Sequence, residues 1–157
     1  MKIFTEIRYF SSVILRDMSF FGSYVCVVVT FLLFLVLNQI QFAKTYFIGV
    51  VILTLIEIMI KLFYKNKRPD FKSIHPYSAF QKFEEGSSFP SGHSGKAAFF
   101  TSLIHIFYGN LALTGLFTFT TIYVGISRIF LKRHFVLDIL GGFVLGIAIA
   151  ILTTHLF

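Results

Sequence analysis

The stretch from Ser127 to Asp138 holds several side chains that could act on a phosphate group. His134 and Asp138 are four positions apart, so on a helix that starts near residue 133 they share one face. A carboxylate placed there accepts the N–H of one imidazole nitrogen and leaves the other nitrogen free as a base or nucleophile. Arg128 adds a planar donor fork suited to phosphate. Taken alone, the stretch is equally well interpreted as a basic loop with an incidental histidine.

A second group of candidate residues closes an apolar run. Lys61 and Arg68 are seven positions apart and line one face if a helix persists between them. Pro69 then breaks the helix directly after the arginine. Glu57 precedes Lys61 by one turn and is placed to pair with it, which would offset the cost of a carboxylate inside a membrane. Cations also flank membrane spans simply to reach the interface, so this group alone does not indicate a site.

A third group, Pro90 to His93, precedes another apolar run. Proline, serine and glycine in this order are typical of the start of a helix. Gly92 would also let backbone N–H groups approach a phosphate, with Ser91 adding a hydroxyl. His93 is then placed to protonate a leaving oxygen. Both the structural and the functional interpretation stay open for this segment by itself.

The composition defines the elements that must position these residues. Hydrophobic residues make up 56% of the 157 residues and charged residues 13%, and the mean hydropathy is +0.81. Soluble domains average about 25% charged residues, so these values predict an integral membrane protein with a single domain over 1–157. The net charge of +7 indicates anionic lipid headgroups or a phosphorylated substrate. Nucleic acid is excluded as a partner because the cations flank apolar runs.

The apolar runs predict an all-α integral membrane helical bundle of about five transmembrane helices. Residues 3–16 interleave charges with apolar residues at helical spacing, which predicts an additional N-terminal helix lying in the interface. Gly142 and Gly146 predict close helix packing. Because each span reverses direction, the three candidate groups are expected on one face of the membrane. The five predicted spans are 19–43, 45–64, 91–108, 111–131 and 134–157.

Together the three groups resemble the motifs of the type 2 phosphatidic acid phosphatase superfamily. The matching patterns are K-x6-R-P at 61–69, P-S-G-H at 90–93 and S-R-x5-H-x3-D at 127–138. That family includes membrane lipid phosphatases and soluble vanadium haloperoxidases, and the apolar composition favours the membrane branch. Larger membrane members have a sixth span where this chain offers only the predicted interfacial helix.

The resemblance implies a role for each motif residue. His134 is the expected nucleophile that forms a phosphohistidine, Asp138 orients it, and His93 is the general acid for the departing lipid group. No metal and no cofactor are expected, since cationic side chains take the role that Mg²⁺ has elsewhere. The expected phosphate-binding residues are Lys61, Arg68, Ser91, Gly92 and Arg128.

The predicted function is hydrolysis of a phosphate monoester or diphosphate of an envelope lipid. Lipid A 1-phosphate, undecaprenyl diphosphate and phosphatidylglycerophosphate all fit, and the sequence does not choose among them. The alternatives are a lipid-to-lipid phosphotransferase and a non-catalytic lipid-binding or transport protein, and the complete motif set argues against the latter. The expected partners are the lipid substrate and the bilayer, with no obligate protein partner.

The predicted location is the inner (cytoplasmic) membrane, as a multi-pass protein. Two arguments disagree about which side the active site faces. All of the 14 lysine and arginine residues except Lys44 fall on the predicted active-site face, which the positive-inside rule places in the cytoplasm. Resemblance to bacterial lipid phosphatases instead favours the periplasmic face, and that is the prediction retained.

Overall fold

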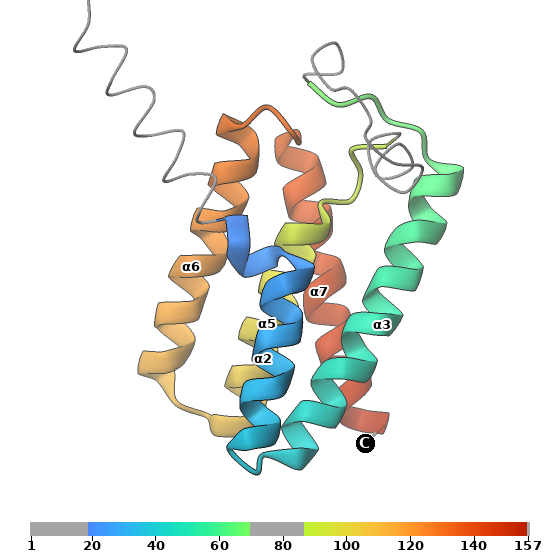
Figure 1. Ribbon diagram of the computed structural model, residues 1–157. Helices are drawn as coiled ribbons and strands as arrows, with labels where there is room; N and C mark the ends of the chain where they lie inside the picture. The colour runs from blue at the N-terminus through green and yellow to red at the C-terminus, as the bar shows by residue number, and fades with distance from the viewer. Residues whose placement is uncertain (1–18, 70–86, 157) are drawn as a thin grey trace, which may run out of the picture.

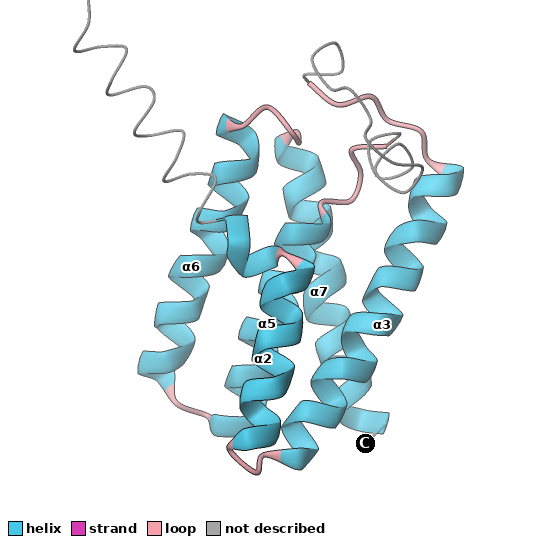
Figure 2. Ribbon diagram, in the orientation of Figure 1, coloured by secondary structure: helices cyan, strands magenta, loops and turns pink. Residues whose placement is uncertain are grey.

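The computed structural model describes residues 19–69 and 87–156, and every regular element within them is a helix (Figure 2). The predicted all-α fold class is therefore confirmed. The predicted interfacial helix over 3–16 lies outside the described residues. In chain order the elements are the 3-10 helix η1 (Ser19–Gly22) and the α-helices α2 (Tyr24–Val36), α3 (Ile40–Phe63), α5 (Gly92–Tyr108), α6 (Leu111–Phe130) and α7 (Val136–Leu156).

Three of these helices are long and apolar enough to cross a membrane, namely α3, α6 and α7, with 24, 20 and 21 residues. A helix rises about 1.5 Å per residue, so 20 residues span the roughly 30 Å hydrocarbon core. The first predicted span, 19–43, is not one continuous helix but contains η1, α2 and the start of α3. Helix α2 has only 13 residues, and the chain reverses at Asn38, whose φ is +57°, instead of after Ala43. Asparagine tolerates this left-handed conformation better than most residues.

The outward faces of the helices are apolar, as a lipid environment requires. Large side chains on α6 and α7 are among the most exposed of the described residues, with Phe130 70% and Val144 68% exposed. A continuous apolar surface of this kind is unfavourable in water. Other exposed apolar residues on these two helices are Leu116, Phe119, Ile122, Leu140, Ile147 and Ile151.

Helix α5 is the central element and contacts α3, α6, α7 and η1. Its contact with α7 is close because glycines face each other. A Cβ on Gly142 would collide with the carbonyl oxygen of Ser91, and one on Gly146 would collide with the carbonyl oxygen of Gly95. Small residues at such positions let two helix backbones approach, so the predicted close packing at Gly142 and Gly146 is confirmed.

The arrangement of the helix ends matters most for function. The C-terminal ends of α3 and α6 and the N-terminal ends of α5 and α7 lie together at the upper end of the molecule in Figure 1. The α2–α3 and α5–α6 turns and the end of α7 lie at the opposite end. The expectation that all three motif groups fall on one side of the bundle therefore holds for the described residues.

Candidate active site

Residues from all three motif groups line one small polar cavity at this end, with a volume of about 40 Å³. The other two predicted site residues, Ser91 and Asp138, are buried and are not among the residues that line it. Helices α3, α5 and α6 and the turn before α7 each contribute side chains, so no single helix contains the site. The lining residues are Glu57, Lys61, Arg68, Gly92, His93, Lys96, Arg128 and His134.

His134 is held by a backbone carbonyl that the sequence did not indicate. Its Nδ1 lies 2.8 Å from the carbonyl oxygen of Ser88, and the side chain is buried. A carbonyl oxygen only accepts hydrogen bonds, so Nδ1 carries the proton and Nε2 carries the lone pair. The Oδ2 of Asp138 is 3.7 Å from Nδ1, which is too long for a hydrogen bond but within ion-pair range. The expectation that Asp138 accepts the imidazole N–H directly is therefore not met.

Asp138 instead organises the start of α7. Its Oδ2 accepts the backbone N–H of Phe135 at 2.8 Å, while the carbonyl of Phe135 accepts the N–H of Asp138 at 3.1 Å. This reciprocal pattern corresponds to half of a capping box, with Phe135 as the N-cap. Helix α7 begins at Val136 and not near residue 133, so His134 lies in the turn before the helix. Asp138 thus fixes the turn that carries His134.

Burial lowers the pKa of the His134 imidazole, and the cations Arg68, Arg128 and Lys61 lower it further. The Asp138 carboxylate opposes them by raising this pKa. The balance favours the neutral ring at neutral pH, with the Nε2 lone pair available. A neutral imidazole is the form required of a nucleophile.

The two cations of the first motif reach the cavity from different segments, one from helix α3 and one from the chain after it. Lys61, in the last turn of α3, pairs with Glu57 at 2.5 Å, as expected from their spacing. Helix α3 ends at Phe63, so Arg68 is not carried on the same helical face as Lys61, contrary to the sequence interpretation. Arg68 follows Asn66, whose carbonyl accepts the N–H of Ser88 at 2.8 Å. This hydrogen bond joins the segment after α3 to the stretch before α5.

The second motif forms the start of α5. Ser91 is the N-cap residue, and its hydroxyl lies 3.0 Å from the hydroxyl of Ser94 within the protein interior. Its N–H donates to the carbonyl of Asp138 at 2.9 Å, which connects the starts of α5 and α7. Gly92 admits no side chain, because a Cβ there would collide with the carboxylate of Glu57. Ser91 is not among the residues that line the polar cavity, and its predicted hydroxyl contact to phosphate stays a prediction.

Residues 23–157 match the sequence profile of the PAP2 superfamily. This chain belongs to the PAP2 superfamily. The resemblance identified from the three motifs is therefore confirmed, and with its apolar helices the chain is a multi-pass membrane protein.

A curated relative of this PAP2 chain is phosphatidylglycerophosphatase B of Bacillus subtilis (strain 168). The two are 34% identical over 111 residues, which cover 59% of this chain and 47% of the relative. The match thus spans about half of that relative's length.

Two solved structures share the fold. Aquifex aeolicus LpxE superposes with a TM-score of 0.76 and 19% identity, covering 93% of this chain and 86% of that one. The first transmembrane PAP2 type phosphatidylglycerolphosphate phosphatase from Bacillus subtilis superposes with a TM-score of 0.74 and 23% identity. The superposition covers 94% of this chain and 76% of that one.

One cavity-lining residue of this PAP2 protein, Lys96, lies outside the three motif patterns. It follows His93 by one turn of α5 and is 3% exposed. Its Nζ lies 3.6 Å from Oε2 of Glu57 and 4.2 Å from the centroid of the Tyr24 ring. The sequence contained a signal for it, since Lys96 is the only Lys, Arg, Asp or Glu in α5. A lone charge within an apolar helix is a functional candidate by default.

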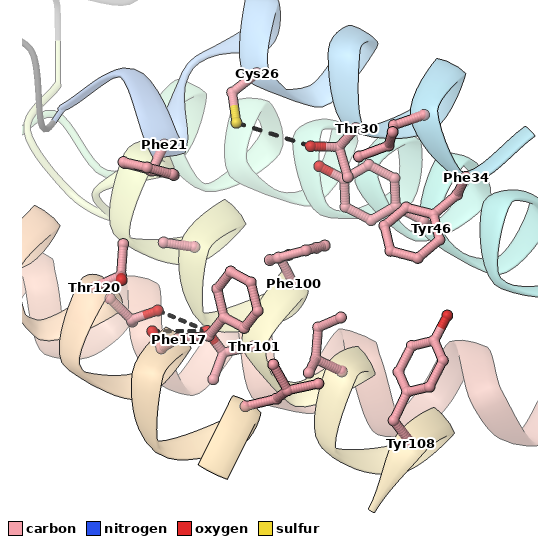
Figure 3. Close-up of a pocket in the computed structure, with 15 residues that line it drawn as sticks. Phe21, Cys26, Thr30, Phe34, Tyr46, Phe100, Thr101, Tyr108, Phe117 and Thr120 are labelled. Carbon is pink, nitrogen blue, oxygen red and sulfur yellow. Dashed lines mark hydrogen bonds between the residues drawn. The ribbon is translucent and has the colours of Figure 1, made fainter. Parts of the chain in front are cut away.

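An apolar cavity of about 380 Å³ lies between α2, α5 and α6 (Figure 3). Lys96 and Ala97 are neighbours on α5, and the former lines the polar cavity while the latter lines the apolar one. Consecutive residues of α5 thus line a polar and an apolar cavity. Labelled residues around the apolar cavity in Figure 3 include Phe21, Cys26, Thr30, Tyr46, Phe100 and Phe117.

Proposed function

We propose that this protein is an integral membrane phosphatase that hydrolyses a phosphate monoester or diphosphate of an envelope lipid through a phosphohistidine. The observation that carries the proposal is the convergence of two histidines and four cationic side chains on one polar cavity, at the end of the bundle where α3 and α6 end and α5 and α7 begin. Cations stabilise the charge on the non-bridging oxygens of a transferring phosphoryl group. Family membership supports the same reaction class.

In the proposed first step, Nε2 of His134 attacks phosphorus as the bond from phosphorus to the lipid oxygen breaks. The negative charge of the bound phosphate favours the protonated form of His93. His93 then gives its proton to the departing oxygen, which leaves as a lipid alcohol or, from a diphosphate, as a lipid phosphate. In the second step, His93 takes a proton from water, whose oxygen attacks the phosphohistidine. The nitrogen–phosphorus bond breaks, inorganic phosphate leaves, and both histidines return to their starting forms.

The phosphate-binding role is proposed for Lys61, Arg68 and Arg128, with the backbone at Gly92. Because these residues supply positive charge, we propose that the reaction needs no metal ion. The described residues contain no group of three or more His, Cys, Asp or Glu side chains that could hold one.

A lipid is the proposed substrate because the neighbours Lys96 and Ala97 on α5 line the polar cavity and the apolar cavity of about 380 Å³, and both cavities lie in a membrane-spanning bundle. Phosphatidylglycerophosphate, which the name of the Bacillus subtilis relative indicates, is one candidate. Lipid A 1-phosphate and undecaprenyl diphosphate are the others.

The test is phosphate release by the purified full-length protein from these three lipids in mixed micelles, with and without EDTA. We expect release from at least one lipid, unaffected by the chelator and inhibited by vanadate, which mimics pentacoordinate phosphorus. No release from any phosphorylated lipid would overturn the proposal. Loss of turnover in EDTA that Mg²⁺ restores would overturn its metal-free part. Phosphate appearing on a second lipid instead of in solution would identify a phosphotransferase.

A further inference from the structure

Glu57 lies between two lysines that come from different helices. Its Oε1 is 2.5 Å from Nζ of Lys61 on its own helix α3, and its Oε2 is 3.6 Å from Nζ of Lys96 on α5. A Cβ on Gly92 would overlap the same carboxylate, so Glu57 lies directly against the first turn of α5. The carboxylate therefore links the ends of α3 and α5 at the floor of the polar cavity.

The three charged groups do not neutralise one another. One carboxylate faces two ammonium groups, and Glu57, Lys61 and Lys96 are only 4%, 7% and 3% exposed. Buried charges are costly unless they are paired, so this cluster retains a positive charge that favours an anion. All three residues line the cavity that also holds Arg68 and Arg128. A phosphate in that cavity would supply the missing negative charge.

Lys96 is held in place without its hydrogen-bonding capacity being used up. Its ammonium has three N–H donors, whereas its contacts to Glu57 and to the carbonyl oxygen of Gly92 are long, at 3.6 and 3.4 Å. The Tyr24 ring of α2, with its centroid 4.2 Å from Nζ, attracts the cation. These contacts position the ammonium at the cavity wall and leave donor capacity for a ligand.

We propose that Lys96 is a further phosphate-binding residue of this site, and that Glu57 is a positioning residue that holds Lys96 and Lys61 at the two oxygens of one carboxylate. This inference rests on the proposed phosphatase function. It adds a cation from α5 to those that the three motifs supply. It also explains why a carboxylate, which repels phosphate, stands in an anion site: Glu57 acts through the lysines and does not contact the substrate.

The experiment compares Lys96→Met, Lys96→Arg and Glu57→Gln by KM, kcat and the inhibition constants of vanadate and inorganic phosphate. Lys96→Met should raise KM and both inhibition constants by roughly 10- to 100-fold, the range expected for losing a hydrogen bond to a charged group. Lys96→Arg keeps the charge and should recover most of the affinity. Glu57→Gln should weaken the same constants, and less so in the Lys96→Met background, because the two residues act as one unit.

The control is Lys44→Met, which removes an exposed lysine near the far end of α3 and should change none of these constants. A purely structural Lys96 would give lower kcat or stability with unchanged KM and inhibition constants, and that result would overturn the inference. If Lys96→Met does not purify as a folded protein, Lys96→Gln is measured against the same expectation. An inactive wild-type protein would refute the proposed phosphatase, whereas an active one with unaltered phosphate affinity in the Lys96 variants refutes only this inference.

Discussion

At the scale of single residues, the state of His134 is set by two neighbours with different tasks. The Ser88 carbonyl at 2.8 Å fixes the proton on Nδ1, and the Asp138 carboxylate at 3.7 Å supplies a negative charge without a hydrogen bond. In the mechanism we propose, the carbonyl determines which nitrogen attacks. The carboxylate would then stabilise the positive charge that develops on the ring when Nε2 bonds to phosphorus.

Replacing His134 by alanine should abolish turnover, because the change removes the proposed nucleophile. His93→Ala should lose roughly 10²–10⁴-fold in rate, the usual worth of a positioned acid. The measurement is phosphate release together with trapping of a labelled phosphoenzyme, and His105→Ala at the far end of α5 is the control. A phosphoenzyme that still forms in His134→Ala would identify a different nucleophile.

Asp138→Asn should keep the fold, because the amide oxygen can still accept the Phe135 N–H that caps α7. The lost negative charge should lower the rate and change its pH dependence. Asp138 raises the pKa of His134, so its removal lowers this pKa. Since the neutral ring is the active form, the acidic limb of kcat/KM against pH should move to lower pH. An acidic limb at the same pH in both proteins would show that the carboxylate does not act on His134.

At the scale of helices, the α5–α7 contact sets the distance between His93 and His134, the two histidines that we propose as catalytic. Gly146→Ala would force apart the backbones of these helices, since its Cβ would meet the Gly95 carbonyl. We expect a loss of about 1–3 kcal/mol in stability and lower kcat. Gly115→Ala on α6 is the matched control, because nothing lies within 4 Å of its added Cβ. Thermal unfolding in detergent and phosphate release test this, and equal stability of both variants would contradict it.

The cavity between α2, α5 and α6 should determine which lipids are accepted. Thr120→Phe would fill part of this cavity, and we expect lower kcat/KM on a long-chain lipid with little change on a short-chain phosphate ester. Thr118→Phe is the control, since Thr118 is on the same helix but lines a different cavity between α5, α6 and α7. Equal losses on both substrates would indicate general damage. A selective loss in Thr118→Phe alone would assign the lipid chain to that other cavity.

At the scale of the whole molecule, the bundle is polarised, with the polar cavity at one end and the α2–α3 and α5–α6 turns at the other. The cations to which we assign phosphate binding also bias a count of charges across the membrane. Charge asymmetry therefore reflects both topology and the substrate here, and it is a weaker guide to orientation than in a protein without an anion site.

We predict that the active-site end faces the periplasm. In a Cys26→Ser background, Lys65→Cys beyond the end of α3 should react with a membrane-impermeant thiol reagent in intact spheroplasts. Gln39→Cys, next to the α2–α3 turn, is the matched position at the opposite end and should react only after lysis. The reverse pattern would place the active site in the cytoplasm, as the charge count suggests.

The sequence by itself determined the class of the fold and the family to which its motifs belong. Apolar runs long enough to cross a bilayer permit only helices, because backbone groups in lipid must be satisfied within the segment. Reversal at each turn then placed the three motif groups at one end, and the Glu57–Lys61 pair followed from helical spacing. These features depend on local patterns along the chain, which is why hydropathy and residue spacing reveal them.

Only the tertiary structure decided which atoms support His134 and which residues complete the cavity. The Ser88 carbonyl is 46 positions away from His134, and Lys96 meets Glu57 only because α5 lies against α3. The start of α7 at Val136, which removes His134 from the helix, follows from the cap that Asp138 forms with the Phe135 backbone. Contacts between helices depend on how closely their backbones approach, and no periodicity within one segment encodes that distance.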